Sequence, residues 1–283
     1  MSLSFVDISA HPNILPLISK QSSALVATFL YNPRLSSIFA TQQRWLLAHA
    51  AMALAFREGG AASPRMTLAR FLDEAQTNGL ASRNTADAFI KEMLHYGYAV
   101  PTTDPHDRRA KPLVVTAEPL AMLYRWAVTH LVTLDGLDGG QRLKAMEAIP
   151  EAFAHLEIEI AASVLTTASI REPQNTVSLF TWLHNGGVIM DWLITSLHEI
   201  SEDGQRYVTS ITSIGEIASW IKLSRTHLTR KLREAEAMGS MGWTAKRGDS
   251  AMWVSSAFIC EVIAYQAAKL AIIDAACERA FKP

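Results

Sequence analysis

The chain has 283 residues, of which 49% are hydrophobic and 19% charged, and its formal net charge is −1. This composition is typical of a globular protein and excludes a disordered one. Scarce glycine and proline favour helices. No apolar run approaches the roughly 20 residues that span a bilayer. Residues 1–20 lack the basic head and apolar stretch of a secretory signal, so we expect a cytoplasmic location.

Helical patterns account for most of the chain outside two segments described below. In chain order, they cover residues 13–31, 36–58, 118–133, 139–148, 151–169, 177–183, 188–200 and 256–281. We expect these helices to form a bundle that joins two halves of the molecule. A loop at 135–140 and Pro150 interrupt the helices, which places the boundary between a first domain, 1–149, and a second, 150–283.

The two remaining segments, 66–116 and 213–255, share one layout. Each opens with apolar residues at the i, i+3, i+4, i+7 spacing that marks the buried face of a short helix. These residues are Leu68, Phe71, Leu72 and Ala75 in the first segment, and Ile214, Ile217, Ala218 and Ile221 in the second. A turn and a second helical pattern follow in both, which predicts a helix-turn-helix.

The second helix of each segment is delimited by the same residue types. Ser82-Arg83 and Ser224-Arg225 open it, and serine is a favoured N-cap. Gly97 and Gly239 follow it, as glycine commonly does at a helix C-terminus. The second serine lies 142 residues after the first (224 − 82), and each glycine lies 15 residues after its serine. These matches indicate an internal duplication.

A hairpin is predicted after each second helix. In the first copy, residues 98–116 flank a polar tip at 103–111; in the second, residues 243–255 flank a turn at 246–249. A hairpin placed after a helix-turn-helix is a wing. The expected fold is therefore mostly α with small β wings: two winged helix-turn-helix units joined by a helical, dimerisation-like bundle.

The second of the two recognition helices has a face suited to DNA. At 100° per residue, Arg225, Thr226, Thr229, Arg230 and Arg233 fall on one side. Leu228, Leu232 and Ala235 fall on the other side. Lys222 and Lys231 add positive charge, and no acid occurs from 222 to 233. A basic, slender face opposite a packed one is what a major-groove helix needs.

The first recognition helix is less basic. Its outward face carries Arg83, Asn84 and Lys91, next to Ser82, but also Asp87. Arginine and asparagine are good readers of base edges, whereas a carboxylate repels phosphate and accepts only from cytosine N4. This helix is either a second reader of DNA or an inherited site that has degraded.

The first hairpin resembles the wing of the MarR family of bacterial regulators. The resemblance rests on Asp104-Pro105-His106-Asp107-Arg108-Arg109-Ala110-Lys111, followed by Val114-Val115-Thr116. Upstream, Thr67-Leu68-Ala69 and residues 82–100 also look like the family's helix-turn-helix; together the match covers about fifty residues. It implies that Arg109 reaches the minor groove, that Asp107 holds it, and that Arg108 and Lys111 lie near phosphate.

The chain departs from the family by carrying two such units. The second tip, with Lys246 and Arg247, supplies charge without the Asp-x-Arg motif. We interpret the chain as a single-chain pseudo-dimer, a transcriptional regulator that binds an asymmetric double-stranded DNA site. The resemblance also implies a pocket for a small-molecule effector. Candidate lining residues are Trp45, His49, Trp126, Trp182 and Trp192, although aromatic residues at helical spacing more often form core.

Two other classes of function compete with this interpretation. A winged-helix interaction or scaffold protein that has lost DNA binding would suit the near-neutral charge and Asp87. An enzyme is not expected, because no catalytic motif occurs and residues 184–187 suit a turn. Cys260 and Cys277 form no metal-binding pattern, so no metal or cofactor is expected; they are buried thiols or, alternatively, a redox switch.

Overall fold

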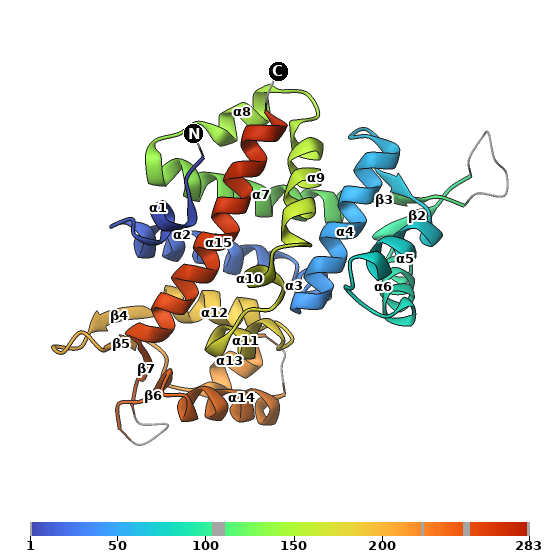
Figure 1. Cartoon of the computed structure of the whole chain (residues 1–283). Coiled ribbons are helices and arrows are strands. Elements are labelled where there is room, and N and C mark those ends of the chain that lie inside the picture. Colours follow the sequence, from blue (N-terminus) through green and yellow to red (C-terminus); the bar gives the residue numbers. More distant parts are fainter. Residues whose placement is uncertain (1, 104–110, 222–223, 246–249, 282–283) are drawn as a thin grey trace. The chain divides into compact units, whose positions relative to one another are not determined.

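The fold is mostly helical, with two small antiparallel sheets, as the sequence predicted (Figure 1). The structure is a computed structural model that describes residues 2–103, 111–221, 224–245 and 250–281. Each sheet combines a strand pair that follows one predicted helix-turn-helix segment with one or two strands that precede the helices of that segment.

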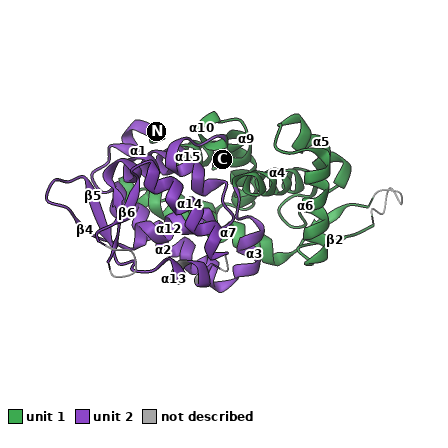
Figure 2. Cartoon of the chain, turned by 90° about the horizontal axis from the view of Figure 1, so that it is seen from below, with its two compact units in different colours: residues 1–4, 42–171, 269–283 green, residues 5–41, 172–268 purple. Residues whose placement is uncertain are grey.

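Two compact units interleave along the sequence (Figure 2). Unit 1 comprises residues 1–4, 42–171 and 269–283, and unit 2 comprises residues 5–41 and 172–268. This division differs from the single boundary expected near Pro150, with domains 1–149 and 150–283. The reason is that the N-terminal helices pack within unit 2 and the end of the last helix packs within unit 1. In both cases, the residues that pack together are far apart in the sequence.

Unit 1 is built around the helix α4. Its elements are α4 (Gln42–Gly59), β1 (Arg65–Met66), α5 (Leu68–Thr77), α6 (Arg83–His95), β2 (Ala99–Pro101), β3 (Leu113–Val115), α7 (Ala117–Asp138), α8 (Arg142–Ala148), α9 (Ala152–Val164) and α10 (Ala168–Arg171). Nearly every residue of α4 from Leu46 to Phe56 is buried, because α4 packs against α9 on one side and α5 and β1 on another. The sheet order is β1-β3-β2.

Unit 2 holds the second of the two predicted helix-turn-helix segments. Its elements are α1 (Phe5–Ser9), α2 (Ile14–Tyr31), α3 (Pro33–Ile38), α11 (Asn175–Thr181), α12 (Gly186–Thr195), β4 (Leu197–Ile200), β5 (Arg206–Thr209), α13 (Ile214–Trp220), α14 (Arg225–Ala237), β6 (Met241–Trp243) and β7 (Met252–Ser255). The last helix, α15 (Ser256–Ala280), contributes its first part to unit 2 and its last part to unit 1. The helices α2 and α12 pack closely against each other.

The same order of elements occurs in both units. Each has two short helices, α5 and α6 or α13 and α14, followed by an antiparallel strand pair, as predicted for 82–97 and 224–239 with the strands that follow. The strand order β1-β3-β2 in unit 1 matches β5-β7-β6 in unit 2, where β4 is an additional edge strand. Gly97 and Gly239 end the second helices with φ of 72° and 73°, a left-handed conformation that glycine adopts without a steric penalty.

The predicted serine N-caps are found at only one of the two helix starts. The Ser82 hydroxyl accepts a hydrogen bond from the backbone N–H of Thr85 at 3.2 Å, as expected of an N-cap. Ser224 occupies the equivalent position, but its side chain makes no capping hydrogen bond. The expectation that both serines act as caps is therefore correct only for the first helix.

Three predicted helices are wrong in part. The pattern at 188–200 predicted one helix, but the helix ends at Thr195 and Leu197–Ile200 is strand β4, which pairs with β5. The patterns at 36–58 and 151–169 each predicted one helix, but breaks separate α3 from α4 and α9 from α10. Local periodicity does not show that a strand partner lies downstream. Of the turn expected at 184–187, residues 184 and 185 form the turn before α12, with Asn185 at φ 58°, whereas Gly186 and Gly187 begin α12.

Among the described residues, α15 is the one helix long and apolar enough to cross a membrane. In the most apolar 18-residue stretch of α15, 44% is buried inside the fold. The helix also buries Lys269 and Asp274. A core helix of a soluble protein has the same length and composition, so the chain can be soluble.

Candidate nucleic-acid interface

The helix α14 has one buried face and one cationic face, as the sequence predicted. Leu228, Leu232 and Ala235 are all 0% exposed. On the opposite side, Arg225, Thr226, Arg230 and Arg233 are exposed and Thr229 is half-buried. The apolar spacing therefore holds α14 on its unit and directs the arginines to solvent.

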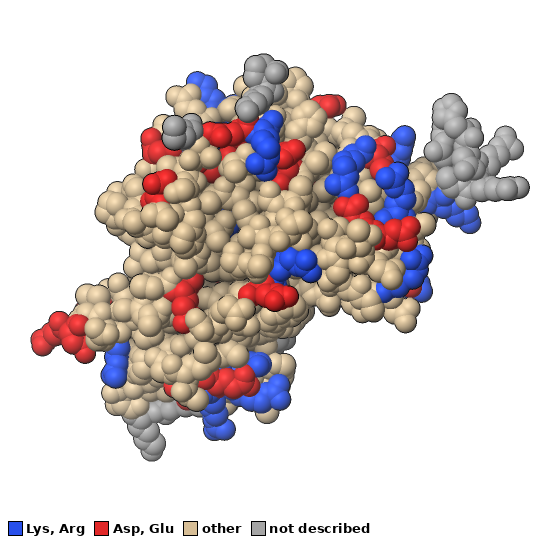
Figure 3. Space-filling view, viewed as in Figure 1, with Lys and Arg blue, Asp and Glu red and all other residues tan. Residues whose placement is uncertain are grey.

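Positive charge on α14 is largely uncompensated. Within the described part of the chain, Arg225, Arg230 and Arg233 form no ion pair, whereas Lys231 pairs with Glu234 at 2.6 Å. The two acids of α14, Glu234 and Glu236, both lie in its C-terminal half. The N-terminal half thus combines free guanidinium groups with the positive end of the helix dipole. In Figure 3, basic side chains project from the lower edge of α14.

The helix α6 carries its predicted residues on the surface, but their charge is compensated. Ser82, Arg83, Asn84 and Lys91 are exposed. Arg83 pairs with Asp73 of α5 at 3.1 Å, and Lys91 pairs with Asp87 at 2.7 Å. Basic and acidic side chains are intermixed over α5 and α6 (Figure 3). This face is close to neutral, so α6 attracts phosphate less than α14 does.

Sequence reasoning identified Asp87 as an acid on this face but missed its ion pair with Lys91, and it missed Asp73 altogether. Asp87 and Lys91 are four residues apart on one helix, a spacing at which side chains meet. Asp73 lies on the preceding helix, ten residues before its partner, and only the turn between α5 and α6 brings the two together. No periodic signal in the sequence reports such a contact.

Several predicted contact residues lie outside the described residues. They are Asp107, Arg108 and Arg109 of the first wing, Lys246 and Arg247 of the second wing, and Lys222 before α14. Lys111, which follows the first of these gaps, is exposed near the start of β3. The expected minor-groove contact of Arg109 therefore remains a prediction from the sequence.

Three of the five proposed effector-pocket residues meet in unit 1. The ring centroids of Trp45 and His49 are 4.5 Å apart, and those of His49 and Trp126 are 5.1 Å apart. Trp182 and Trp192 belong to unit 2, and Trp182 is 51% exposed. The first three residues are packed on one another in edge-to-face contacts, the arrangement aromatic rings adopt in a protein core.

This aromatic cluster encloses buried ionisable groups. His49 Nδ1 and Glu157 Oε1 are 2.8 Å apart, and both side chains are 2% exposed. Burial raises the pKa of Glu157, while His49 lowers it. His130 is 0% exposed, and its Nδ1 donates to the carbonyl oxygen of Trp126 at 2.8 Å. Burial, together with Lys269, lowers the pKa of His130 to about 3.

We expect His130 to make the fold sensitive to acid. The pKa of His130 is the ordinary 6.5 in the unfolded chain, and burial lowers this pKa to about 3 in the folded chain. Between these values the unfolded chain binds a proton that the folded chain does not, so stability is lost as pH falls through this window. The loss is about 1.4 kcal/mol per pH unit. Replacing His130 with leucine should flatten this slope in denaturant unfolding measured across the window.

The exposed His155 on α9 supplies the matched control for this experiment. His155→Ala should leave the slope of stability against pH as it is in the wild type. An unchanged slope in His130→Leu would show that some other group causes the acid sensitivity.

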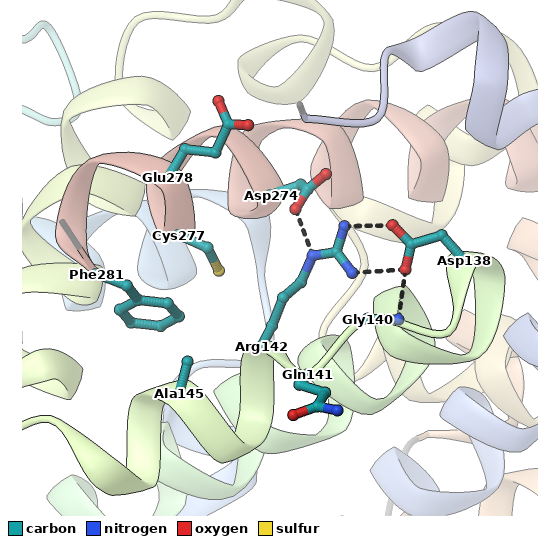
Figure 4. Close-up of a pocket in the computed structure, with 9 residues that line it drawn as sticks. All are labelled: Asp138, Gly140, Gln141, Arg142, Ala145, Asp274, Cys277, Glu278 and Phe281. Atoms are coloured by element: carbon teal, nitrogen blue, oxygen red, sulfur yellow. Dashed lines mark hydrogen bonds and ion pairs between the residues drawn. The ribbon is translucent and has the colours of Figure 1, made fainter.

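Unit 1 also has a pocket of about 380 Å³ beside Arg142 (Figure 4). It is lined by Asp138, Gly140, Gln141, Arg142, Ala145, Asp274, Cys277, Glu278 and Phe281. The Arg142 guanidinium makes two hydrogen bonds to Asp138, at 2.7 and 2.8 Å, and a further one to Asp274. Its charge is therefore already neutralised, which leaves no cation among these lining residues to bind an anionic ligand.

The buried thiol of Cys277 shows little sign of reactivity. Burial raises the pKa of Cys277 to about 12, with Asp274 acting in the same direction. A thiol with so high a pKa is a poor nucleophile. Cys260 is exposed, and Cys277 is buried. Because seventeen residues separate them on one helix, they cannot form a disulfide with each other.

Comparisons of the chain with family models, with curated proteins and with solved structures gave no match.

Proposed function

We propose that the chain is a transcriptional regulator that binds double-stranded DNA, with one winged helix-turn-helix in each compact unit. In this proposal the two units arose by duplication and act together as a single-chain pseudo-dimer. The matched element order, strand order and helix-ending glycines support the duplication. The MarR-like wing sequence at 104–111 and a small-molecule effector belong to the same proposal.

The observation that carries the proposal is the exposed, uncompensated arginine face of α14. Arg225, Arg230 and Arg233 lie opposite the buried Leu228 and Leu232. A helix held by one face that presents guanidinium groups on the other can enter a major groove and contact both phosphates and guanine edges. Thr226 and Thr229 on the same face add short hydroxyl side chains that fit close to the bases.

A specific observation supports the rival function for the other half. On α6, both cations are paired with carboxylates, so this helix resembles an ordinary solvated surface. If α14 behaved in the same way, the chain would be an interaction or scaffold protein built on the same fold. In our proposal α14 is the principal DNA-binding helix and α6 the weaker one.

The salt dependence of DNA binding tests the proposal. Fluorescence anisotropy with a random-sequence duplex should show binding whose log K falls steeply with log salt, by about 0.9 for each phosphate neutralised. A slope of about −3 or steeper would match contacts from the three arginines. No binding at low salt, or binding with a flat slope, would favour the scaffold function instead.

A further inference from the structure

The strand pair that follows α14 has a different kind of residue pair at its centre from its counterpart in unit 1. In unit 1, Val100 of β2 lies opposite Val114 of β3. In unit 2, the same place is taken by Gly242 of β6 opposite Trp253 of β7. A small–large pair has therefore replaced a pair of equal size.

Gly242 is needed here because Trp253 lies across it. A Cβ atom at position 242 would be 2.6 Å from Cζ2 and 2.8 Å from Cε2 of the indole ring. Such distances are too short for two carbon atoms in contact. Gly242 does not have a positive φ, so close approach, and not an unusual backbone conformation, explains this glycine.

The indole ring of Trp253 links its own strand β7 to β6 and β5, and the indole of Trp243 extends these contacts to α14. Its Nε1 donates to the carbonyl oxygen of Trp243 at 3.3 Å. Trp243 Nε1 in turn donates to Glu236 Oε1, in the last turn of α14, at 3.1 Å. The guanidinium of Arg206 on β5 lies 4.4 Å from the centroid of the Trp253 ring, within the range of cation–π contact.

We propose that Gly242, Trp243 and Trp253 form a brace that fixes the direction of α14, and that this brace sets the DNA specificity of unit 2. The inference rests on the proposed function. The buried residues Leu228, Leu232 and Ala235 hold α14 along its length, but a stripe of aliphatic side chains still allows a helix to rock. The hydrogen bond to Glu236 ties down the C-terminal end of α14. A change in the tilt of α14 would make the positions of Arg230 and Arg233 variable. Hydrogen bonds to base edges require better-defined positions than contacts with phosphates do, so specificity would suffer first.

The decisive variant copies the pair of unit 1 into unit 2. Gly242→Val combined with Trp253→Val removes the ring and its hydrogen bond, and it also removes the three atoms that a Cβ at position 242 would meet first. Val100 and Val114 form the same pair in the sheet of unit 1. The probes are a duplex selected by the wild type from a random pool about three helical turns long, and a scrambled duplex of the same length.

We expect the double variant to bind the selected duplex about tenfold more weakly, comparable to the loss of one base contact, and the scrambled duplex with little change. A second variant, Trp243→Phe, keeps an aromatic ring but removes the indole N–H that reaches Glu236. It should show the same selective loss, even if the double variant does not fold. The matched control is Val100→Ala in β2, which should leave both affinities unchanged.

Equal losses on both duplexes, or no loss on either, would overturn the brace while leaving the DNA-binding function intact. If the wild type selects no duplex, the proposed function itself fails, and the brace fails with it. The two failures are therefore distinguishable in a single set of measurements.

Discussion

The double variant Arg230→Ala, Arg233→Ala should reduce the slope of log K against log salt by up to about two for duplex DNA. Both side chains are exposed on α14, and neither forms an ion pair with another described residue. Each guanidinium that contacts phosphate releases counterions on binding, and its removal lowers the slope by about 0.9. Anisotropy titrations at several salt concentrations measure the slope directly.

The matched control is Arg83→Ala with Lys91→Ala on α6. These two cations are paired with Asp73 and Asp87, so removing them should change the slope less than the α14 variant does. Asp87→Asn should have the opposite effect, tightening non-specific binding, because it releases Lys91 and removes a repulsive charge. A silent α14 variant together with lost binding in the α6 variant would reverse our ranking of the two helices.

The variant Arg142→Ala should destabilise the fold by about 3 kcal/mol, which is typical of breaking a buried ion pair. The Arg142 side chain is 13% exposed and interacts with Asp135, Asp138 and Asp274. Asp274 is 3% exposed and also accepts a hydrogen bond from the backbone N–H of Leu3 at 2.6 Å. Without Arg142, a nearly buried carboxylate would face two others with no cation between them. Urea denaturation followed by circular dichroism gives the free energy of unfolding.

A surface ion pair in the same unit provides the comparison. Arg57 and Glu74 are 2.6 Å apart, with side chains 38% and 23% exposed. Arg57→Ala should cost under about 1 kcal/mol because water replaces the lost partner. The loss of stability in Arg142→Lys should lie between those of Arg142→Ala and Arg57→Ala, because an ammonium cannot bind three carboxylates in the geometry of a guanidinium. If Arg142→Ala costs no more than Arg57→Ala, the Arg142 cluster is not a stabilising element.

Local sequence determined the parts of the protein whose contacts are local. The spacing of Leu228, Leu232 and Ala235 predicted the buried face of α14, and all three are buried. Gly97 and Gly239 predicted where α6 and α14 end, because the left-handed conformation favours glycine wherever it occurs. The exposed arginine face of α14 followed from the same helical geometry. These features depend on residues within a few positions of each other.

Only the tertiary structure decided which distant segments pack together. The division of the chain into two interleaved units depends on α2 packing with α12 and on Asp274 meeting Arg142, contacts that helical periodicity cannot report. The strand β4 was mistaken for the end of a helix because its partner β5 lies beyond a turn. The weaker DNA-binding role that we propose for α6 depends in the same way on Asp73, which the fold brings to Arg83. In each case the deciding partner is set by packing between elements, whereas periodicity records only the side of an element that is buried.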